Sequence, residues 1–258
     1  MLQDNIEKVI NIAQKYHLTT SQFQELWMII EPIFIHTEFQ RRMTDEYPHH
    51  DLVTLGEHII SDTIVTYILS KKQKTDYNLK TALHISMFHD LYTLPWQNNK
   101  ENKRYKLFNM HGFTHPIEAV VNAATWYPTY FEKESESKKI VDGVIHHMYP
   151  FPVRAVDKND MELNNATSYE KLPNSIKEQI KDSTSRGNIR FSFLSKGKNE
   201  FLKGTVSLSR SLYKEGNVMS KADKIVSFKK DFTINGAIAC VTGYNKNLEQ
   251  NTYYSKSK

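Results

Sequence analysis

Apolar residues recur at helical spacing along most of the 258-residue chain, and this periodicity constrains the fold more than any other feature. Residues 51–72 illustrate it, because Leu55, Ile59, Ile64 and Ile68 fall on one face of a helix. Only 9 glycines and 8 prolines are available to interrupt such segments. The sequence therefore predicts a mainly α fold, with helices over residues 4–17, 20–34, 51–72, 78–90, 114–127, 137–148 and 215–232.

The pattern changes beyond residue 150. Residues 149–168 contain two prolines and several Asn and Asp residues, which is typical of a long loop. Residues 188–209 alternate apolar and polar side chains on both sides of "KGKN", which is compatible with a β-hairpin. We therefore expect a single domain over residues 1–258, with N-terminal helices in 1–44, a core in 45–156 and 215–258, and a small mixed insertion near 157–214.

Composition excludes several classes of protein. The longest apolar run, "WMIIEPIFI", contains a glutamate and a proline and is far shorter than the roughly 20 residues that span a bilayer. Cys240 is the single cysteine, so no intrachain disulfide can form, and the first residues lack a signal-peptide pattern. We expect a cytoplasmic protein without a membrane partner. The oligomeric state is not indicated.

The formal net charge is +5, from 34 basic and 29 acidic residues. Much of the excess lies in short basic runs such as "KKQK" and "NKENKRYK", which are either solvated surfaces or attract an anionic substrate. These runs are not interleaved with aromatic residues along a stripe. A dedicated nucleic-acid groove is therefore not expected.

Histidine and aspartate recur near the ends of successive predicted helices. Each one alone is more often a hydrogen-bonded structural residue, but intervals of about one helix plus a connection would let the helices of a bundle meet at one point. Imidazole and carboxylate together suit Fe, Mn, Ni or Zn. Five histidines and two aspartates exceed the needs of one ion, so two divalent transition metals sharing Asp90 are expected. The candidate ligands are His58, His89, Asp90, His115, His146, His147 and Asp223.

These motifs resemble the HD superfamily of metal-dependent phosphohydrolases. The resemblance rests on "FHD" at 88–90, on His58 in the helix "GEHIISDTIV", and on Asp223 in "SKADKIVS". The additional "THP" at 114–116 and "IHHM" at 145–148 resemble the two-metal branch, which includes the cyclic-dinucleotide phosphodiesterases of the HD-GYP type. The resemblance implies an HD-domain helical bundle.

Carried onto this sequence, the resemblance implies two adjoining metal sites. His58, His89, Asp90 and Asp223 would hold one ion, and Asp90, His115, His146 and His147 the other. Such a pair clamps a phosphoryl group and lowers the pKa of a bridging water, so that hydroxide attacks phosphorus. The implied function is hydrolysis of a small phosphate ester, of a nucleotide or cyclic nucleotide, with Asp90 catalytic.

The sequence also departs from the family. Thr93 stands where many relatives carry a lysine or glutamate that assists the reaction, and the glycine-rich continuation after the paired histidines is missing. Lys100, Arg104 and His111 are candidates to assist the leaving group. The alternative interpretation of each is a solvated surface residue without a catalytic role.

Arginine residues are candidates for contact with substrate phosphate through bidentate hydrogen bonds, namely Arg41, Arg42 and Arg154. Among the other histidines, His49 and His50 could support the site, with His50 in reserve for His58, while His17, His36 and His84 are expected to be structural.

Two other functions use nearly the same residues. An HD-type di-iron oxygenase cleaves C–C or C–P bonds with O₂ at a similar mixed His and Asp set. A nucleotide-binding signalling module could keep the ligands with little turnover, using the insertion as its partner surface. The paired histidines at 146 and 147 favour hydrolysis.

Overall fold

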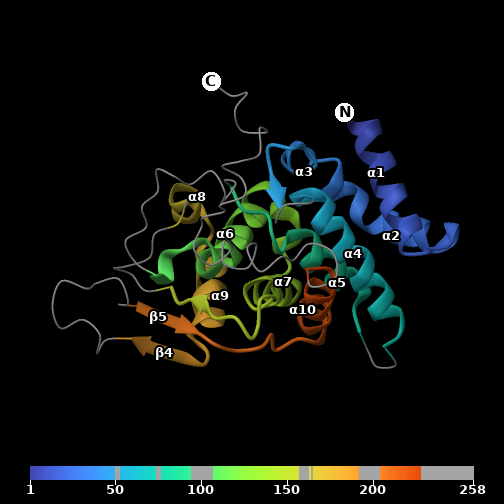
Figure 1. Cartoon of the computed structure of the whole chain (residues 1–258). Coiled ribbons are helices and arrows are strands. Elements are labelled where there is room, and N and C mark those ends of the chain that lie inside the picture. The colour runs from blue at the N-terminus through green and yellow to red at the C-terminus, as the bar shows by residue number, and fades with distance from the viewer. Residues whose placement is uncertain are drawn as a thin grey trace, which may run out of the picture.

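The chain forms a mainly helical structure with a small antiparallel sheet, as the periodicity predicts (Figure 1). This computed structural model describes residues 1–49, 53–73, 77–93, 107–156, 163, 165–191 and 204–227. The α-helices are α1 (Leu2–Lys15), α2 (Thr20–Phe34), α3 (Thr37–Arg42), α4 (Leu55–Lys71), α5 (Leu79–Phe88), α6 (His111–Trp126), α7 (Glu134–Ile145), α8 (Ala166–Lys171), α9 (Asn174–Ser185) and α10 (Lys214–Val226). Two 3₁₀ helices, η2 (Leu107–Asn109) and η3 (Pro128–Phe131), lie on either side of α6.

Helices far apart in the sequence lie side by side in the centre. Helix α4 packs against α5 and α10, and α5 packs against α7, while α10 also contacts α5 and α7 (Figure 1). Helix α6 joins this group through α7. The arrangement brings the ends of five helices into one region, which is what a site assembled from distant residues requires.

Local sequence signals fix where the central helices begin. Thr54 and Glu57 form a capping box at the start of α4, in which each side chain accepts a hydrogen bond from the other residue's backbone N–H. The Asn78 side chain accepts from Thr81 N–H at the start of α5. Because these caps satisfy the first free N–H groups, they set the register of the helices that carry His58 and His89.

Helix α2 has the predicted limits, and Pro32 lies inside its last turn. The predicted start of the helix at 114–127 is wrong. Helix α6 begins at His111 with Met110 before it, and Pro116 lies inside the helix rather than in its first turn. The predicted extension of the last helix beyond residue 227 lies outside the described residues.

The predicted hairpin is confirmed, and the insertion also contains helices α8 and α9. Strand β4 (Asn188–Phe191) pairs antiparallel with β5 (Gly204–Ser207), and β3 (Val153–Arg154) pairs with the other edge of β5. Gly187 has a φ of 57°, a left-handed conformation that favours glycine, directly before β4. A separate two-stranded pair, β1 (Pro48–His49) with β2 (Val53–Thr54), precedes α4.

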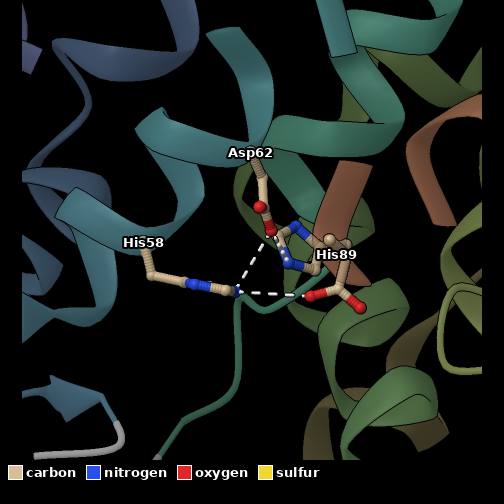
Figure 2. A group of neighbouring side chains, drawn as sticks. His58, Asp62 and His89 are labelled. Atoms are coloured by element: carbon tan, nitrogen blue, oxygen red, sulfur yellow. Dashed lines mark ion pairs between the residues drawn. The ribbon is translucent and has the colours of Figure 1, made fainter. Parts of the chain in front are cut away.

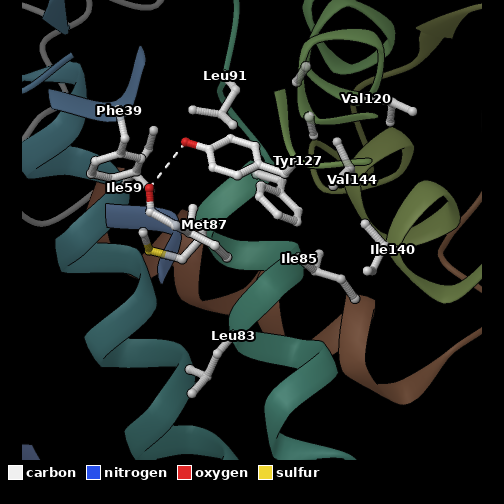
Figure 3. Packing of buried hydrophobic residues seen from close by; sticks show 14 of the residues in the cluster. Phe39, Ile59, Leu83, Ile85, Met87, Leu91, Val120, Tyr127, Ile140 and Val144 are labelled. Atoms are coloured by element: carbon white, nitrogen blue, oxygen red, sulfur yellow. Dashed lines mark hydrogen bonds between the residues drawn. The ribbon is translucent and has the colours of Figure 1, made fainter. Parts of the chain in front are cut away.

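A continuous apolar core surrounds α5 (Figure 3). Leu83, Ile85 and Met87 of α5 are all fully buried, and Tyr127 donates its hydroxyl to the carbonyl oxygen of Ile33 at 3.1 Å. In the described part of the chain, no helix combines the length and the apolar character needed to cross a membrane.

Gly143 marks the closest approach of three helices. A Cβ atom added there would lie 2.7 Å from Ile85 Cδ1 and 2.9 Å from Ile85 Cγ2, and a Cβ added at Gly216 would lie 2.7 Å from Gly143 Cα. No side chain fits between α5, α7 and α10 at this level. The spacing of the helices therefore depends on the two glycines.

We predict that Gly143→Ala lowers the free energy of unfolding by about 1–3 kcal/mol, because the added methyl group overpacks the α5–α7 contact. Ile85→Val, which removes Cδ1, should recover part of this loss in the double variant. Denaturant unfolding of the two single variants and the double variant measures the coupling. Helix propensity alone predicts a gain of about 1 kcal/mol for Gly143→Ala, so a stabilised variant would contradict the packing argument.

His84 is buried in α5, where its ring meets the Tyr130 ring edge to face at 4.6 Å between centroids. Burial, aided by the charge of Lys80, lowers the pKa of His84 to about 3. The unfolded chain has a histidine pKa of about 6.5 and so binds one more proton below that pH. This histidine therefore contributes stability above pH 6.5 that is lost as the pH falls from 6.5 towards 3.

We predict that between pH 6.5 and 4 the unfolding free energy of the native chain falls by up to about 1.4 kcal/mol per pH unit more steeply than that of His84→Asn. Urea unfolding of both proteins at several pH values measures the difference, in which the other titrating groups cancel. Parallel curves would show that His84 is protonated equally in both states.

Candidate metal centre

The ends of α4, α5, α6, α7 and α10 bring most of the predicted ligands together. His58 lies on α4, His89 and Asp90 follow α5, His115 lies on α6, His147 follows α7, and Asp223 lies on α10. All six side chains are buried. Nitrogen and oxygen atoms from them form compact groups that could hold metal ions, namely His58–Asp62–His89–Asp223, His49–His58–Asp90 and Asp90–His115–His147.

Asp90 connects the groups through its two carboxylate oxygens. Oδ2 lies 3.6 Å from His58 Nε2 and 3.5 Å from His89 Nε2. Oδ1 lies 3.4 Å from His115 Nε2 and 3.5 Å from His147 Nε2. One carboxylate thus presents one oxygen to each side, which is the arrangement of a ligand shared between two neighbouring cations.

Two carboxylates lie close to the His58 ring. His58 Nε2 lies 3.1 Å from Asp62 Oδ2 and 3.7 Å from Asp223 Oδ1. His89 Nε2 lies 3.1 Å from the same Asp62 oxygen. Figure 2 shows the side chains of His58, Asp62 and His89 converging from two different helical segments.

Three of the imidazoles, on both sides of Asp90, are oriented by the backbone. The Nδ1 atoms of His89, His115 and His147 lie 2.7, 3.0 and 2.7 Å from the carbonyl oxygens of Ser86, His111 and Val144, respectively. A carbonyl oxygen only accepts, so each Nδ1 carries a hydrogen and each Nε2 faces the cluster, where it offers a lone pair once it has no proton. Backbone orientation of this kind is typical of histidines that bind metals.

The distances between the donor atoms suit a shared cation better than direct contact between the donors. The Nε2 atoms of His115 and His147 are 3.2 Å apart, and two lone pairs at this distance repel unless a proton or cation lies next to them. Ligand atoms bound about 2.0–2.2 Å from a transition metal lie roughly 2.8–3.6 Å from each other. The His–Asp separations of 3.1 and 3.4 Å fall within that range, and the His58–Asp223 separation of 3.7 Å lies just above it.

Burial and mutual pairing shift the pKa values in opposite directions. Burial alone raises the pKa of Asp90, but the His89 charge and hydrogen bonds from His115 and His147 hold it well below its ordinary value. Burial lowers the pKa of His89, but the Asp90 and Asp62 carboxylates overcome this and raise it to about 9. Burial, reinforced by the nearby charge of Asp62, raises the pKa of Asp223. A proton on His89 therefore competes directly with a cation.

Asp62 belongs to the centre although the sequence analysis did not select it. It lies four residues after His58 on α4, and its side chain is fully buried. The i, i+4 spacing that places both residues on one helix face is a signal that could have identified it. An aspartate within the isoleucine-rich part of this helix is a second signal, because an unpaired carboxylate is costly when buried.

His146 is not brought into the cluster. Its Nε2 lies 3.1 Å from the carbonyl oxygen of Ser183, and the Ser209 hydroxyl lies 3.3 Å from either ring nitrogen. Successive residues in a helical turn point about 100° apart, so His147 faces the ligands and its neighbour faces the insertion. Burial lowers the pKa of His146 to about 4, despite the opposing effect of Asp142.

Arg42 has a structural role instead of the predicted contact with substrate. The side chain is fully buried, and its guanidinium stacks against the rings of Tyr47 and Trp126. It donates to the carbonyl oxygens of Glu38 and Tyr92, each at 2.6 Å. Since Tyr92 follows Asp90 closely, Arg42 fixes the segment that carries the shared carboxylate.

The other two predicted arginines contact acids and backbone of neighbouring elements. Arg41 is half exposed on α3, with ion pairs to Glu38 at 3.5 Å and Glu46 at 4.0 Å. Arg154 is buried in β3 and donates to the carbonyl oxygen of Thr205 in β5 at 2.8 Å. This bond ties its guanidinium to the sheet.

Thr93 helps to hold the segment after Asp90. Asn122 of α6 donates its amide to the Leu91 carbonyl oxygen at 2.6 Å and to Thr93 Oγ1 at 2.9 Å, while Tyr47 donates to the Thr93 carbonyl oxygen at 3.0 Å. Thr93 therefore has a structural role, through hydrogen bonds of its side chain and its backbone.

Among the remaining candidates, the structure describes His111 and His49. His111 is buried and stacks on His115 at 4.8 Å, and the Tyr92 ring meets it edge to face at 4.7 Å. His49 stacks on His58 at 3.8 Å, as expected for a supporting residue. Lys100, Arg104 and His50 lie outside the described residues.

We predict that Asp62→Asn lowers the affinity of the protein for Mn²⁺ or Zn²⁺ by at least about 10-fold, because the cluster loses a buried negative charge without a change in shape. His146→Asn should leave affinity and stoichiometry unchanged, because His146 faces away. Competition titration with a chelating dye and elemental analysis measure both. Equal loss in the two variants would indicate general damage to the fold, and no loss in Asp62→Asn would remove that residue from the centre.

Comparisons with known proteins give no further assignment: no family model, no curated protein and no solved structure matches the chain. Buried His and Asp groups that could hold metal ions are therefore the functional feature that the structure itself supplies. The function is inferred below from the donor atoms of these groups and from their surroundings.

Proposed function

We propose that this chain is a metal-dependent phosphohydrolase of the HD type, which holds two divalent transition metals, Fe, Mn, Ni or Zn, and hydrolyses a small phosphate ester of the nucleotide class. The supporting observation is the position of Asp90, whose two oxygens face two separate sets of imidazoles. A single bound ion would leave one of these sets without a cation.

The proposed ligand sets differ from those implied by the family resemblance. His58, Asp62, His89 and Asp223, with one oxygen of Asp90, would hold the first ion. His115 and His147, with the other oxygen, would hold the second. When bound, such ions polarise a phosphoryl group and acidify water, which provides a nucleophile near neutral pH.

The residues of the chain position these groups in advance. Backbone carbonyls fix the tautomers of His89, His115 and His147, so their Nε2 lone pairs need no rearrangement. Ser220 and Lys224 of α10 both donate to the carbonyl oxygen of His147, at 2.5 and 3.2 Å, which links that histidine to the helix carrying Asp223. His111, stacked on His115, is the described residue best placed to exchange a proton with a leaving group.

A di-iron oxygenase is the second candidate, because the mixed His and Asp set suits iron equally well. The absence of His146 from the cluster removes the paired-histidine argument that favoured hydrolysis in the sequence. The two activities are separable. A phosphohydrolase cleaves a phosphate ester with water and without O₂, whereas an oxygenase consumes O₂ and requires iron.

We predict that under anaerobic conditions, in the presence of Mn²⁺, Fe²⁺ or Ni²⁺, the protein hydrolyses at least one mono-, di- or cyclic nucleotide, which is measured as inorganic phosphate from a terminal phosphate or as the phosphomonoester product of a diester. Asp90→Asn should lower this turnover more than about 100-fold, because the substitution weakens both ion sites together. Asp182→Asn, the same change on an exposed residue of α9, is the matched control and should retain full turnover.

The outcomes separate the three functions. Oxygen uptake with iron and no phosphate release would favour the oxygenase. Tight nucleotide binding without either reaction would favour the signalling module. Turnover that survives Asp90→Asn would place the chemistry elsewhere in the chain.

A further inference from the structure

His49 lies beside the metal centre but belongs to neither ligand set of the proposed function. It ends strand β1, whose partner β2 runs directly into α4. The strand pair sets His49 opposite Val53, and the backbone N–H of Leu55 donates to the Tyr47 carbonyl oxygen at 2.7 Å. The segment that contains β1 is therefore held against the first turn of α4, which carries His58.

The His49 ring is placed to share a cation with His58. The two imidazoles are buried and stacked, with 3.8 Å between ring centroids and 27° between ring planes. One nitrogen of each ring and one oxygen of Asp90 lie within 4.8 Å of one another. Ligand atoms bound about 2.0–2.2 Å from one transition metal lie at most about 4.4 Å apart, so a small movement brings all three into coordination.

Two of the compact donor groups share His58. The inner group is His58, Asp62, His89 and Asp223, and the outer group is His49, His58 and Asp90. A neutral imidazole nitrogen has a single lone pair and binds one cation at a time. A cation at His58 can therefore lie in either group, and the outer group is the one that contains the Asp90 carboxylate.

The position of this cation sets its distance from the second one. Ions that clamp one phosphoryl group lie about 3.5–4 Å apart. Asp90 bridges two ions when each lies against a different oxygen of its carboxylate, and Oδ1 already faces His115 and His147. A ligand that draws the first cation towards Asp90 therefore brings the two ions together.

We propose that His49 is a further metal ligand, which holds the cation of His58 against Asp90 and so fixes the separation of the two ions. This inference rests on the proposed two-ion function and adds to it a ligand from a strand outside the helices. Without the His49 nitrogen, the cation would lie in the inner group, further from its neighbour.

Electron paramagnetic resonance of the full-length chain loaded with two equivalents of Mn²⁺ tests the proposal, because two Mn²⁺ ions that share a carboxylate at short range give an exchange-coupled spectrum. The native chain should bind two ions and show this spectrum. His49→Phe keeps a stacked ring but removes the donor, so it should still bind two ions and lose the coupled spectrum in favour of isolated Mn²⁺ lines. His49→Gln should recover the coupling, because its amide oxygen suits Mn²⁺.

His84→Phe is the matched control, since it makes the same change at a buried histidine that belongs to none of the three donor groups. It should keep the coupled spectrum, and circular dichroism checks that every variant keeps its helices. An unchanged coupled spectrum in folded His49→Phe would overturn the inference, as would an equal loss of coupling in His84→Phe. Fewer than two Mn²⁺ ions bound by the native chain, counted by elemental analysis, would instead overturn the two-ion function on which the inference rests.

Discussion

Three carboxylates, from Asp62, Asp90 and Asp223, are buried next to imidazoles where five helices meet. Burying a carboxylate costs several kcal/mol unless it is paired, so this cluster sets a condition that the surrounding structure must satisfy. Histidine nitrogens within 3.1–3.7 Å supply part of the compensation. The part of the burial cost that the histidines do not offset favours a bound cation, because a divalent ion neutralises several of these groups at once.

The rest of the fold serves to hold these groups in place. The absent side chains at Gly143 and Gly216 allow α5, α7 and α10 to approach closely, and this spacing sets how near His147 comes to Asp223. Arg42 and Asn122 fix the segment following Asp90 through its backbone carbonyls. A buried guanidinium that a sequence would assign to substrate thus acts as a structural support.

The sequence predicts the helical class, the hairpin and six of the cluster's side chains because these depend on local periodicity and residue type. It fails where direction matters. His146 and His147 are equivalent in a list of residues, but helical geometry lets only one face the ligands, and the other bonds Ser183. The sequence does not single out Asp62, because the predicted ligands were sought near helix ends and Asp62 lies one turn further into α4 than His58. The structural role of Arg42 depends on its contacts with the rings of Tyr47 and Trp126. These two residues lie far from one another in the sequence, so no local pattern predicts the role.

The proposed sharing of Asp90 by two cations is tested most directly by anomalous X-ray diffraction from crystals grown with Mn²⁺. We expect two anomalous peaks about 3.5–4 Å apart, one on each side of the Asp90 carboxylate, with His89 and His115 on different peaks. A single peak, or none within bonding distance of Asp90, would show that this carboxylate does not bridge two cations.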